Sequence, residues 1–304
     1  MCGIVGLLVK EPRMRERLGE WMLPMLVGMT ERGPDSAGMA VFTEPVTEGA
    51  IKLSLYSGEA HPASRVDWPA LGAAFRAALD ASATLRVAHN HAVLGTTARP
   101  EAARAWLSDH APRLKVLSAG RSIDLYKDVG LPADIAARYR LGEVAGSHLV
   151  GHTRMATESA VNVDNAHPYT AGLDWCLVHN GSLSNPYQLR RALEPLGIAF
   201  DGDCDTEAAC RYLEWRMREG DALEAAIARG FDVFDGFYTF LMGTRDKLAL
   251  VRDPFACKPA IVAETDDYVA IASEFRSLAH LPGIRHASLF EPKPAHVYSW
   301  SVRR

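Results

Sequence analysis

The chain opens with an apolar run, Ile4-Val5-Gly6-Leu7-Leu8, that predicts a β-strand. A helix is predicted within residues 13–30, where Pro24 introduces a kink. The apolar residues that share one face of this helix are Leu18, Trp21, Met22, Met25, Leu26 and Met29. Further helices are predicted at 69–83, 133–139, 187–196 and 208–219. Short apolar or alternating runs predict strands at 39–42, 175–178, 237–242, 248–251, 260–263, 268–272 and 296–300, and within 149–157, which ends in a polar loop. Helices cluster in two places and strands at both ends, which predicts an α+β fold rather than alternating βαβ units.

Two local patterns lie in the middle of the chain. Residues 114–117 and 123–126 flank the turn Ala119-Gly120-Arg121-Ser122, which predicts a β-hairpin. His89-Asn90-His91 could suggest a nuclease or metal motif, but it has no acidic residue at ligand spacing, so we interpret it as structural.

Composition excludes several classes of protein. The 304 residues are 48% hydrophobic and 23% charged, with a formal net charge of −4, which gives no general attraction to nucleic acid or anionic membrane. No apolar run reaches the roughly 18 residues of a membrane helix, no secretory signal is recognisable, and no G-x-G-x-x-G or P-loop indicates a nucleotide. The five cysteines include no C-x-x-C pair, so we expect reduced thiols in the cytoplasm, with neither a metal nor a cofactor.

Cys2 directly follows the initiator methionine. If Met1 is removed, this residue carries both a thiol and an α-amino group whose pKa is about 7.7–8.0 in model compounds. One residue then supplies a nucleophile and a base. The alternative is a small buried cysteine at the start of an edge strand, and Cys2 by itself does not decide between the two.

Three other segments allow two interpretations each. The turn Glu31-Arg32-Gly33-Pro34-Asp35-Ser36 could be a connector in which Arg32 and Asp35 pair. His179-Asn180-Gly181 follows a strand and is first a turn signal, but a sharp turn there could present the Asn180 amide and the Gly181 N–H as an oxyanion hole. Asp205 or Thr206 could be an ordinary helix N-cap.

Together these segments resemble the class II glutamine amidotransferases, which are N-terminal-nucleophile hydrolases. The motifs that carry the resemblance occur in the same order over nearly the whole chain: Met1-Cys2-Gly3-Ile4, Arg32-Gly33-Pro34-Asp35-Ser36, Gly151-His152-Thr153-Arg154, His179-Asn180-Gly181, Asp205-Thr206-Glu207, Arg252-Asp253-Pro254-Phe255, Lys258-Pro259 and Ala272-Ser273-Glu274. The resemblance implies a four-layer αββα sandwich of two antiparallel sheets, spanning residues 2–304 with an accessory insertion at about 86–145.

The same resemblance implies roles for individual residues. Cys2 would attack the side-chain amide of L-glutamine, and Asn180 and Gly181 would stabilise the oxyanion. Arg154, Thr157, Asp205 and His179 would bind the substrate, with Arg154 on its α-carboxylate and Asp205 on its α-ammonium group.

The sequence after Arg154 departs from the relatives that make amino sugars, because Met155-Ala156-Thr157-Glu158-Ser159 replaces a segment with tryptophan and histidine. This form is most similar to the stand-alone glutaminase subunits of glutamate-synthase-like and N-methylglutamate synthase systems, the GlxB type. We therefore expect a cytoplasmic glutaminase subunit that supplies ammonia to separate synthase subunits. The alternatives are a non-catalytic regulatory or scaffold subunit of the same fold, and an amidohydrolase that acts on another amide.

Overall fold

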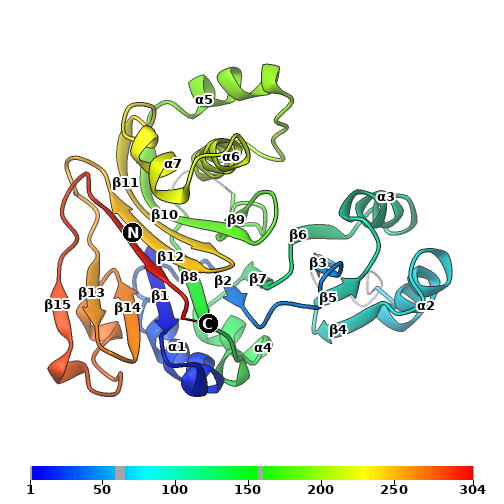
Figure 1. Ribbon diagram of the computed structural model, residues 1–304, viewed down its shortest axis with the longest axis horizontal. Helices are drawn as coiled ribbons and strands as arrows, with labels where there is room; N and C mark the ends of the chain where they lie inside the picture. The colour runs from blue at the N-terminus through cyan, green and yellow to red at the C-terminus, as the bar shows by residue number, and fades with distance from the viewer. Residues whose placement is uncertain (1, 59–65, 157–159, 304) are drawn as a thin grey trace.

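Two antiparallel sheets pack face to face between layers of helices in the computed structural model, which describes residues 2–58, 66–156 and 160–303 (Figure 1). The strands of the seven-stranded sheet are, in spatial order, β15 (Ser288–Phe290), β13 (Ile261–Glu264), β14 (Tyr268–Ala272), β1 (Gly3–Val9), β8 (His148–Arg154), β2 (Ser36–Phe42) and β7 (Ile123–Val129). Those of the five-stranded sheet are β16 (Val297–Ser301), β12 (Lys247–Arg252), β11 (Gly236–Thr244), β10 (Trp175–Leu183) and β9 (Tyr169–Thr170).

Strand β1 lies in the middle of the seven-stranded sheet and is buried on both of its faces. Ile4 and Leu8 point into the interior between the two sheets, where they join Val178 and Leu241 of the five-stranded sheet. The alternate residues, such as Leu7, pack instead against the helices on the outer face. The first strand therefore has a continuous apolar sequence because neither of its faces meets water.

Helices cover the two outer faces. The seven-stranded sheet is covered by α1 (Leu18–Val27), which follows the 3₁₀ turn η1 (Pro12–Arg17), and by α4 (Pro132–Arg138); the five-stranded sheet is covered by α5 (Pro186–Leu193), α6 (Asp205–Arg218) and α7 (Leu223–Gly230) (Figure 1). Shorter 3₁₀ turns are η3 (Leu141–Glu143), η4 (Glu194–Leu196), η5 (Phe275–Ser277) and η6 (Ile284–His286). The four layers confirm the predicted α+β sandwich, whereas α7 was not predicted. Within the described ranges, no helix combines the length and apolar character needed to cross a membrane.

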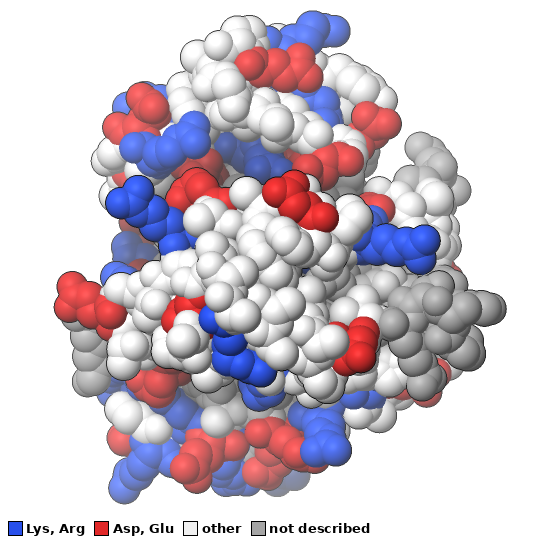
Figure 2. Space-filling model, turned by 90° about the vertical axis from the view of Figure 1, so that its right-hand side faces the viewer, with Lys and Arg blue, Asp and Glu red and all other residues white. Residues whose placement is uncertain are grey.

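A smaller unit projects to one side of the sandwich (Figure 1). Its four-stranded antiparallel sheet has the order β4 (Thr84–Ala88), β5 (His91–Thr96), β3 (Ile51–Tyr56) and β6 (Lys115–Gly120), and it packs against α2 (Trp68–Ala78) and α3 (Pro100–His110) around its own core. On the face of the molecule that this unit occupies, basic and acidic side chains are interspersed rather than gathered by sign (Figure 2). We call residues 51–120 the accessory unit. The insertion expected at about 86–145 overlaps it in part, and its limits relative to other family members stay a prediction.

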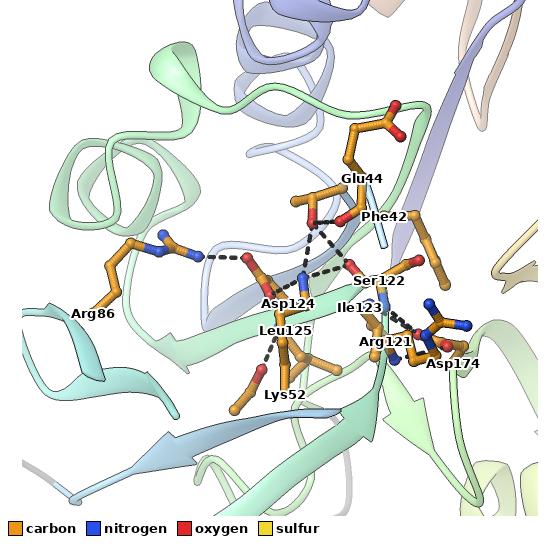
Figure 3. A network of polar contacts seen from close by, with 12 residues as sticks. Phe42, Glu44, Lys52, Arg86, Arg121, Ser122, Ile123, Asp124, Leu125 and Asp174 are labelled. Atoms are coloured by element: carbon orange, nitrogen blue, oxygen red, sulfur yellow. Dashed lines mark hydrogen bonds and ion pairs between the residues drawn. The ribbon is translucent and has the colours of Figure 1, made fainter. Parts of the chain in front are cut away.

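The hairpin predicted around Gly120 is wrong, because β6 pairs with β3 whereas β7 pairs with β2 of the other sheet. A buried carboxylate fixes this corner: Asp174 accepts hydrogen bonds from the backbone N–H groups of residues 121, 122 and 123 at 2.7–3.0 Å (Figure 3). Next to it, the buried Lys52 ammonium of the accessory unit pairs with Asp124 of β7 at 2.7 Å (Figure 3). These contacts attach the accessory unit to the sandwich.

Candidate active site

Cys2 lies at the beginning of the central strand β1, and its thiol is half-buried, with Sγ 3.9 Å from the Met155 carbonyl oxygen. Its own carbonyl accepts a hydrogen bond from Arg32 Nε at 3.0 Å. Two residues further on, Ile4 exchanges hydrogen bonds with Ser273: its N–H donates to Ser273 Oγ and its carbonyl accepts from the Ser273 N–H, both at 3.0 Å. The backbone that carries the thiol is thus held by residues from distant parts of the chain.

The residue after Cys2 has to be glycine for reasons of space. A Cβ atom on Gly3 would lie 2.7 Å from Thr153 Oγ1 and 2.8 Å from Met29 Cβ, which is closer than such contacts occur. Gly3 pairs with Thr153 across the sheet, so Cys2 and Arg154 lie opposite each other at the same end of β1 and β8.

The turn between α1 and β2 lies at this end of the sandwich. Its charged residues, Arg32 and Asp35, bind partners elsewhere in the chain. Arg32 binds the Glu274 carboxylate at 2.8 Å in addition to the Cys2 carbonyl. Asp35 instead accepts a hydrogen bond from the Ala156 N–H at 2.7 Å. The turn therefore fixes both the backbone at Cys2 and the backbone at Ala156.

His179, Asn180 and Gly181 lie within a continuous strand, so the turn predicted at Asn-Gly is wrong. β10 stays paired with β11 from Trp175 to Leu183. Gly181 has φ +146°, and a Cβ atom there would lie 1.8 Å from the Phe237 carbonyl oxygen, so β11 leaves room only for glycine.

Two hydrogen-bond donors of this strand segment have no partner on β11. The Asn180 side chain is 3% exposed, and its Nδ2 has no partner among the described residues. The backbone N–H and carbonyl of Tyr238, opposite Gly181, both bond to Asp253, so Gly181 and Tyr238 form a non-hydrogen-bonded pair. The Gly181 N–H consequently points away from β11. The strand thus presents one side-chain donor and one backbone donor.

Arg154 ends β8 and is 6% exposed, with Nη1 donating to the Ala160 carbonyl at 3.2 Å. The segment between these two residues includes Thr157, which lies outside the described residues. The guanidinium is therefore buried at the same end of the sandwich as Cys2.

Asp205 is the first residue of α6, and the N-cap position before it belongs to Cys204, so neither Asp205 nor Thr206 is the cap. Asp205 Oδ2 accepts from the Leu183 N–H at 2.8 Å, and Oδ1 lies 3.7 Å from His179 Nδ1. Burial alone would raise the pKa of this carboxyl, but His179 and the backbone N–H groups outweigh burial and lower it. Asp205 is thus an ionised carboxylate attached to the end of β10.

Thr206, which the sequence suggested only as a possible helix N-cap, connects the acidic residue to two buried histidines. Its hydroxyl lies 3.2 Å from Asp205 Oδ1, 3.0 Å from His179 Nδ1 and 3.0 Å from His167 Nε2. A hydroxyl has one donor and two acceptor sites, so it donates to the carboxylate and accepts from both rings. His179 Nδ1 therefore carries a proton, and Nε2 has no partner among the described residues.

The histidine cluster extends to the other sheet. His152 Nε2 donates to the His179 carbonyl at 3.0 Å, and its ring stacks on His167 with centroids 4.0 Å apart. Burial lowers the pKa of His152 to about 3 and that of His167 well below its ordinary value. Because Ile4 pairs with His152, this cluster links the strand of Cys2 to the strand of Asn180.

A buried lysine lies beside this cluster. Lys127 of β7 donates to the Ala166 carbonyl at 2.7 Å, and its ammonium lies 5.0 Å from the centre of the Tyr169 ring. Burial lowers the pKa of Lys127 to about 8.

Comparison with known proteins identifies the family. A model of the glutamine amidotransferase domain matches residues 152–280. Over 100% of its length the chain is 47% identical to the glutamine amidotransferase-like protein GlxB of Rhizobium meliloti (strain 1021), of which it covers 99%. The chain belongs to the class II glutamine amidotransferases. A putative glutamine amidotransferase of Methanothermobacter thermautotrophicus is 28% identical over 98% of this chain and 99% of its own.

Solved structures agree with this class II glutamine amidotransferase at the level of the fold. The glutamine phosphoribosylpyrophosphate amidotransferase of B. subtilis matches 99% of the chain with a TM-score of 0.60 and 18% identity. An allosteric regulatory enzyme of purine biosynthesis matches 98% with a TM-score of 0.62 and 18% identity. The chain covers 49% and 46% of those two proteins.

The amidotransferase site proposed from the sequence thus gathers at one end of the sandwich. Cys2 and Arg154 lie opposite each other on adjacent strands, and Asp205 contacts the strand of His179, Asn180 and Gly181. Sequence reasoning assigned no role to His152 and suggested Thr206 only as a helix N-cap, although both lie inside motifs that carried the resemblance. Polar residues within otherwise apolar strands were the signal that could have indicated a buried network. The chemical roles of all these residues stay predictions.

Proposed function

We propose that the chain hydrolyses L-glutamine through a thioester on Cys2 and supplies the ammonia to a separate synthase subunit. The observation that carries the proposal is the position of Cys2: a half-buried thiol at the start of the central strand, opposite Arg154. The buried, unpartnered amide of Asn180 on the facing sheet supports it. The proposal requires the removal of Met1, which lies outside the described residues.

The reaction has two steps. Cys2 Sγ forms a bond to the amide carbon of glutamine while its proton passes to the α-amino group of the same residue. That proton is then given to the leaving nitrogen, the C–N bond breaks, and ammonia departs from a γ-glutamyl thioester. Water attacks the thioester, the C–S bond breaks, and glutamate and the free thiol are formed. No metal or redox partner is needed to balance either step.

The donors of β10 suit the charge that develops in both steps. Asn180 Nδ2 and the Gly181 N–H would bind the oxyanion of each tetrahedral intermediate. Removal of one such donor typically costs about 2.7–4 kcal/mol of transition-state stabilisation. An unpartnered buried amide costs the free protein about 1–3 kcal/mol, which is consistent with a donor kept for the substrate.

Charged residues at the same end suit an amino-acid substrate. We assign the α-carboxylate of glutamine to Arg154, whose planar fork matches a carboxylate, and the α-ammonium group to Asp205. Asp205 is suited to this role because its lowered pKa keeps it ionised at neutral pH. His179, next to Asp205, and Thr157 would also contact the substrate.

Labelling with the glutamine analogue 6-diazo-5-oxo-norleucine tests the assignment. We expect the intact mass of the purified chain to show loss of Met1 and one adduct on Cys2. The exposed Cys257 provides a matched control: Cys257→Ala should still be labelled, and Cys2→Ala should not. A chain that retains Met1 and leaves Cys2 unmodified would refute the proposal. If Cys2→Ala is as active as the wild type in the native complex, the result would favour a scaffold role. Turnover of other amides but not of glutamine would favour a different amidohydrolase.

The separate acceptor subunit rests on the resemblance to GlxB, with which the chain aligns over 99% of that protein's length. The chain spans about half the length of each purine enzyme. Purification of the tagged chain from its native host, followed by an assay of glutamine-dependent amination in the isolated complex, tests this. Glutamine and free ammonium should both support the reaction, and Cys2→Ala should abolish only the glutamine-dependent part. A complex that aminates nothing would count against the proposal.

A further inference from the structure

A cavity of about 550 Å³ opens at the opposite end of the sandwich from Cys2. It lies where β2 ends and β8 begins, between Thr43 and Ser147, and the C-terminal residues Val302 and Arg303 form part of its wall. From Ser147 to Arg154 the strand advances about 3.3 Å per residue, which separates the cavity from the candidate active site by roughly 23 Å. The cavity is therefore distinct from the glutamine site.

The charged lining of the cavity has an excess of two positive charges, in a chain whose formal net charge is −4. Four arginines and two carboxylates make up this lining: Arg15, Arg121, Arg245, Arg303, Glu44 and Asp246. They come from five separate parts of the chain, so the cluster is a product of the fold and not of a basic run in the sequence.

Several polar groups of this wall have unused hydrogen-bonding capacity. Arg15 pairs with Glu44 at 2.8 Å and Arg121 donates to the Val46 carbonyl at 2.7 Å, but the buried Nε of each guanidinium has no partner among the described residues. The Ser122 side chain is 1% exposed, and its hydroxyl also lacks a partner in that part of the chain (Figure 3). Buried donors without partners cost free energy unless a ligand satisfies them.

We propose that this cavity binds a small molecule that carries two or more oxyanion charges, such as a diphosphate or a polycarboxylate. Guanidinium groups bind phosphoryl and carboxylate oxygens in pairs of parallel hydrogen bonds, and Ser122 supplies a hydroxyl that can bind the same oxygens. The volume exceeds that of a single inorganic ion and suits a metabolite. Because β2 and β8 run from this cavity to Ser36 and Arg154, the ligand would bind at the far ends of the strands that carry the glutamine site.

Titration calorimetry of the full-length chain at low ionic strength tests the proposal, with sodium pyrophosphate, sodium phosphate and citrate as separate probes. We expect saturable binding of pyrophosphate or citrate that weakens with added salt. Arg121→Gln and Arg245→Gln should each weaken it at least tenfold. The comparison of pyrophosphate with citrate distinguishes a phosphoryl ligand from a carboxylate ligand.

Two controls keep the test decisive. Arg245 is exposed, so Arg245→Gln reports on binding even if Arg121→Gln, which also loses the contact to Val46, unfolds. Arg285→Gln changes an exposed arginine outside the cavity and should bind the probes as the wild type does. Cys2→Ala should also bind them unchanged, because the cavity does not depend on the glutamine site. The absence of saturable binding, or equal affinities in Arg245→Gln and Arg285→Gln, would overturn the proposal.

Discussion

Replacement of Thr206 by valine removes one hydroxyl and keeps the shape of the side chain. That hydroxyl makes three hydrogen bonds in a site that is 1% exposed, to Asp205, His179 and His167. Each buried polar group left without a partner costs about 1–3 kcal/mol. We take the lower figure for all three bonds, because the two rings can reorient, and expect a loss of about 3 kcal/mol in the free energy of unfolding.

Thermal unfolding measures this loss, and Thr206→Ser is the matched control. For a domain of this size 1 kcal/mol corresponds to roughly 2 °C, so Thr206→Val should lower Tm by roughly 6 °C. Serine keeps the hydroxyl and loses one methyl group, which costs about 1 kcal/mol. If the two variants unfold at the same temperature, the hydroxyl does not connect the cluster as we describe.

Glutamine turnover is a second readout for the same pair of variants. Without Thr206 the Asp205 carboxylate loses a hydrogen bond that fixes its orientation. Under the proposed function, KM for glutamine should rise about tenfold in Thr206→Val, equivalent to about 1.4 kcal/mol of binding, with a smaller change in kcat. A fall in kcat at constant KM would show that Thr206 does not act through substrate binding.

Three further predictions follow from buried groups. Gly181→Ala should prevent normal pairing of β10 with β11, because its Cβ would lie 1.8 Å from the Phe237 carbonyl, and circular dichroism with thermal unfolding should show a large loss of stability or no folded protein. The Lys127 pKa of about 8 lies below its ordinary 10.5, so the unfolded chain binds more protons between these values and stability should rise with pH across that interval. Relative to Lys127→Met the rise should approach roughly 3 kcal/mol in denaturant titrations, and equal pH dependence in the two proteins would contradict it. Lys52→Met should remove one of the two cations that bind the buried Asp124 carboxylate, since Arg86 remains, and cost about 1.5–3 kcal/mol in the same assay, whereas the double variant Lys52→Met with Asp124→Leu should recover much of that loss.

Local pattern was sufficient for most elements of this fold. The strand at 268–272 and the helix at 133–139 were predicted within a residue or two of β14 and α4. The local spacing of apolar residues is enough to define both elements. The hairpin around Gly120 failed because Asp174, more than 50 residues away in sequence, determines the direction in which the chain leaves that corner. No local signal contains that information.

In the candidate site, too, local sequence pattern was informative and long-range contacts were not predicted. The motifs indicated which residues gather, but the Asn-Gly turn was mistaken because pairing with β11 overrides the turn preference of that dipeptide. A local pair between Arg32 and Asp35 was one of the two interpretations of their turn, yet each has a partner from a distant segment, Glu274 or Ala156. Sequence spacing does not report such long-range contacts.

The hydrogen bonds between Ile4 and Ser273 also have a consequence for biosynthesis. The start of the chain acquires the neighbours that hold Cys2 in place only after residues 268–274 have left the ribosome, since β14 and Ser273 border β1 on one side. At about 5–20 residues per second this takes roughly 13–55 s. Under the proposed function, the amino terminus would remain accessible during that interval to the enzyme that removes Met1, and the thiol would not yet be in the environment that activates it. Catalytic competence would then arise late in synthesis, although Cys2 is among the first residues made.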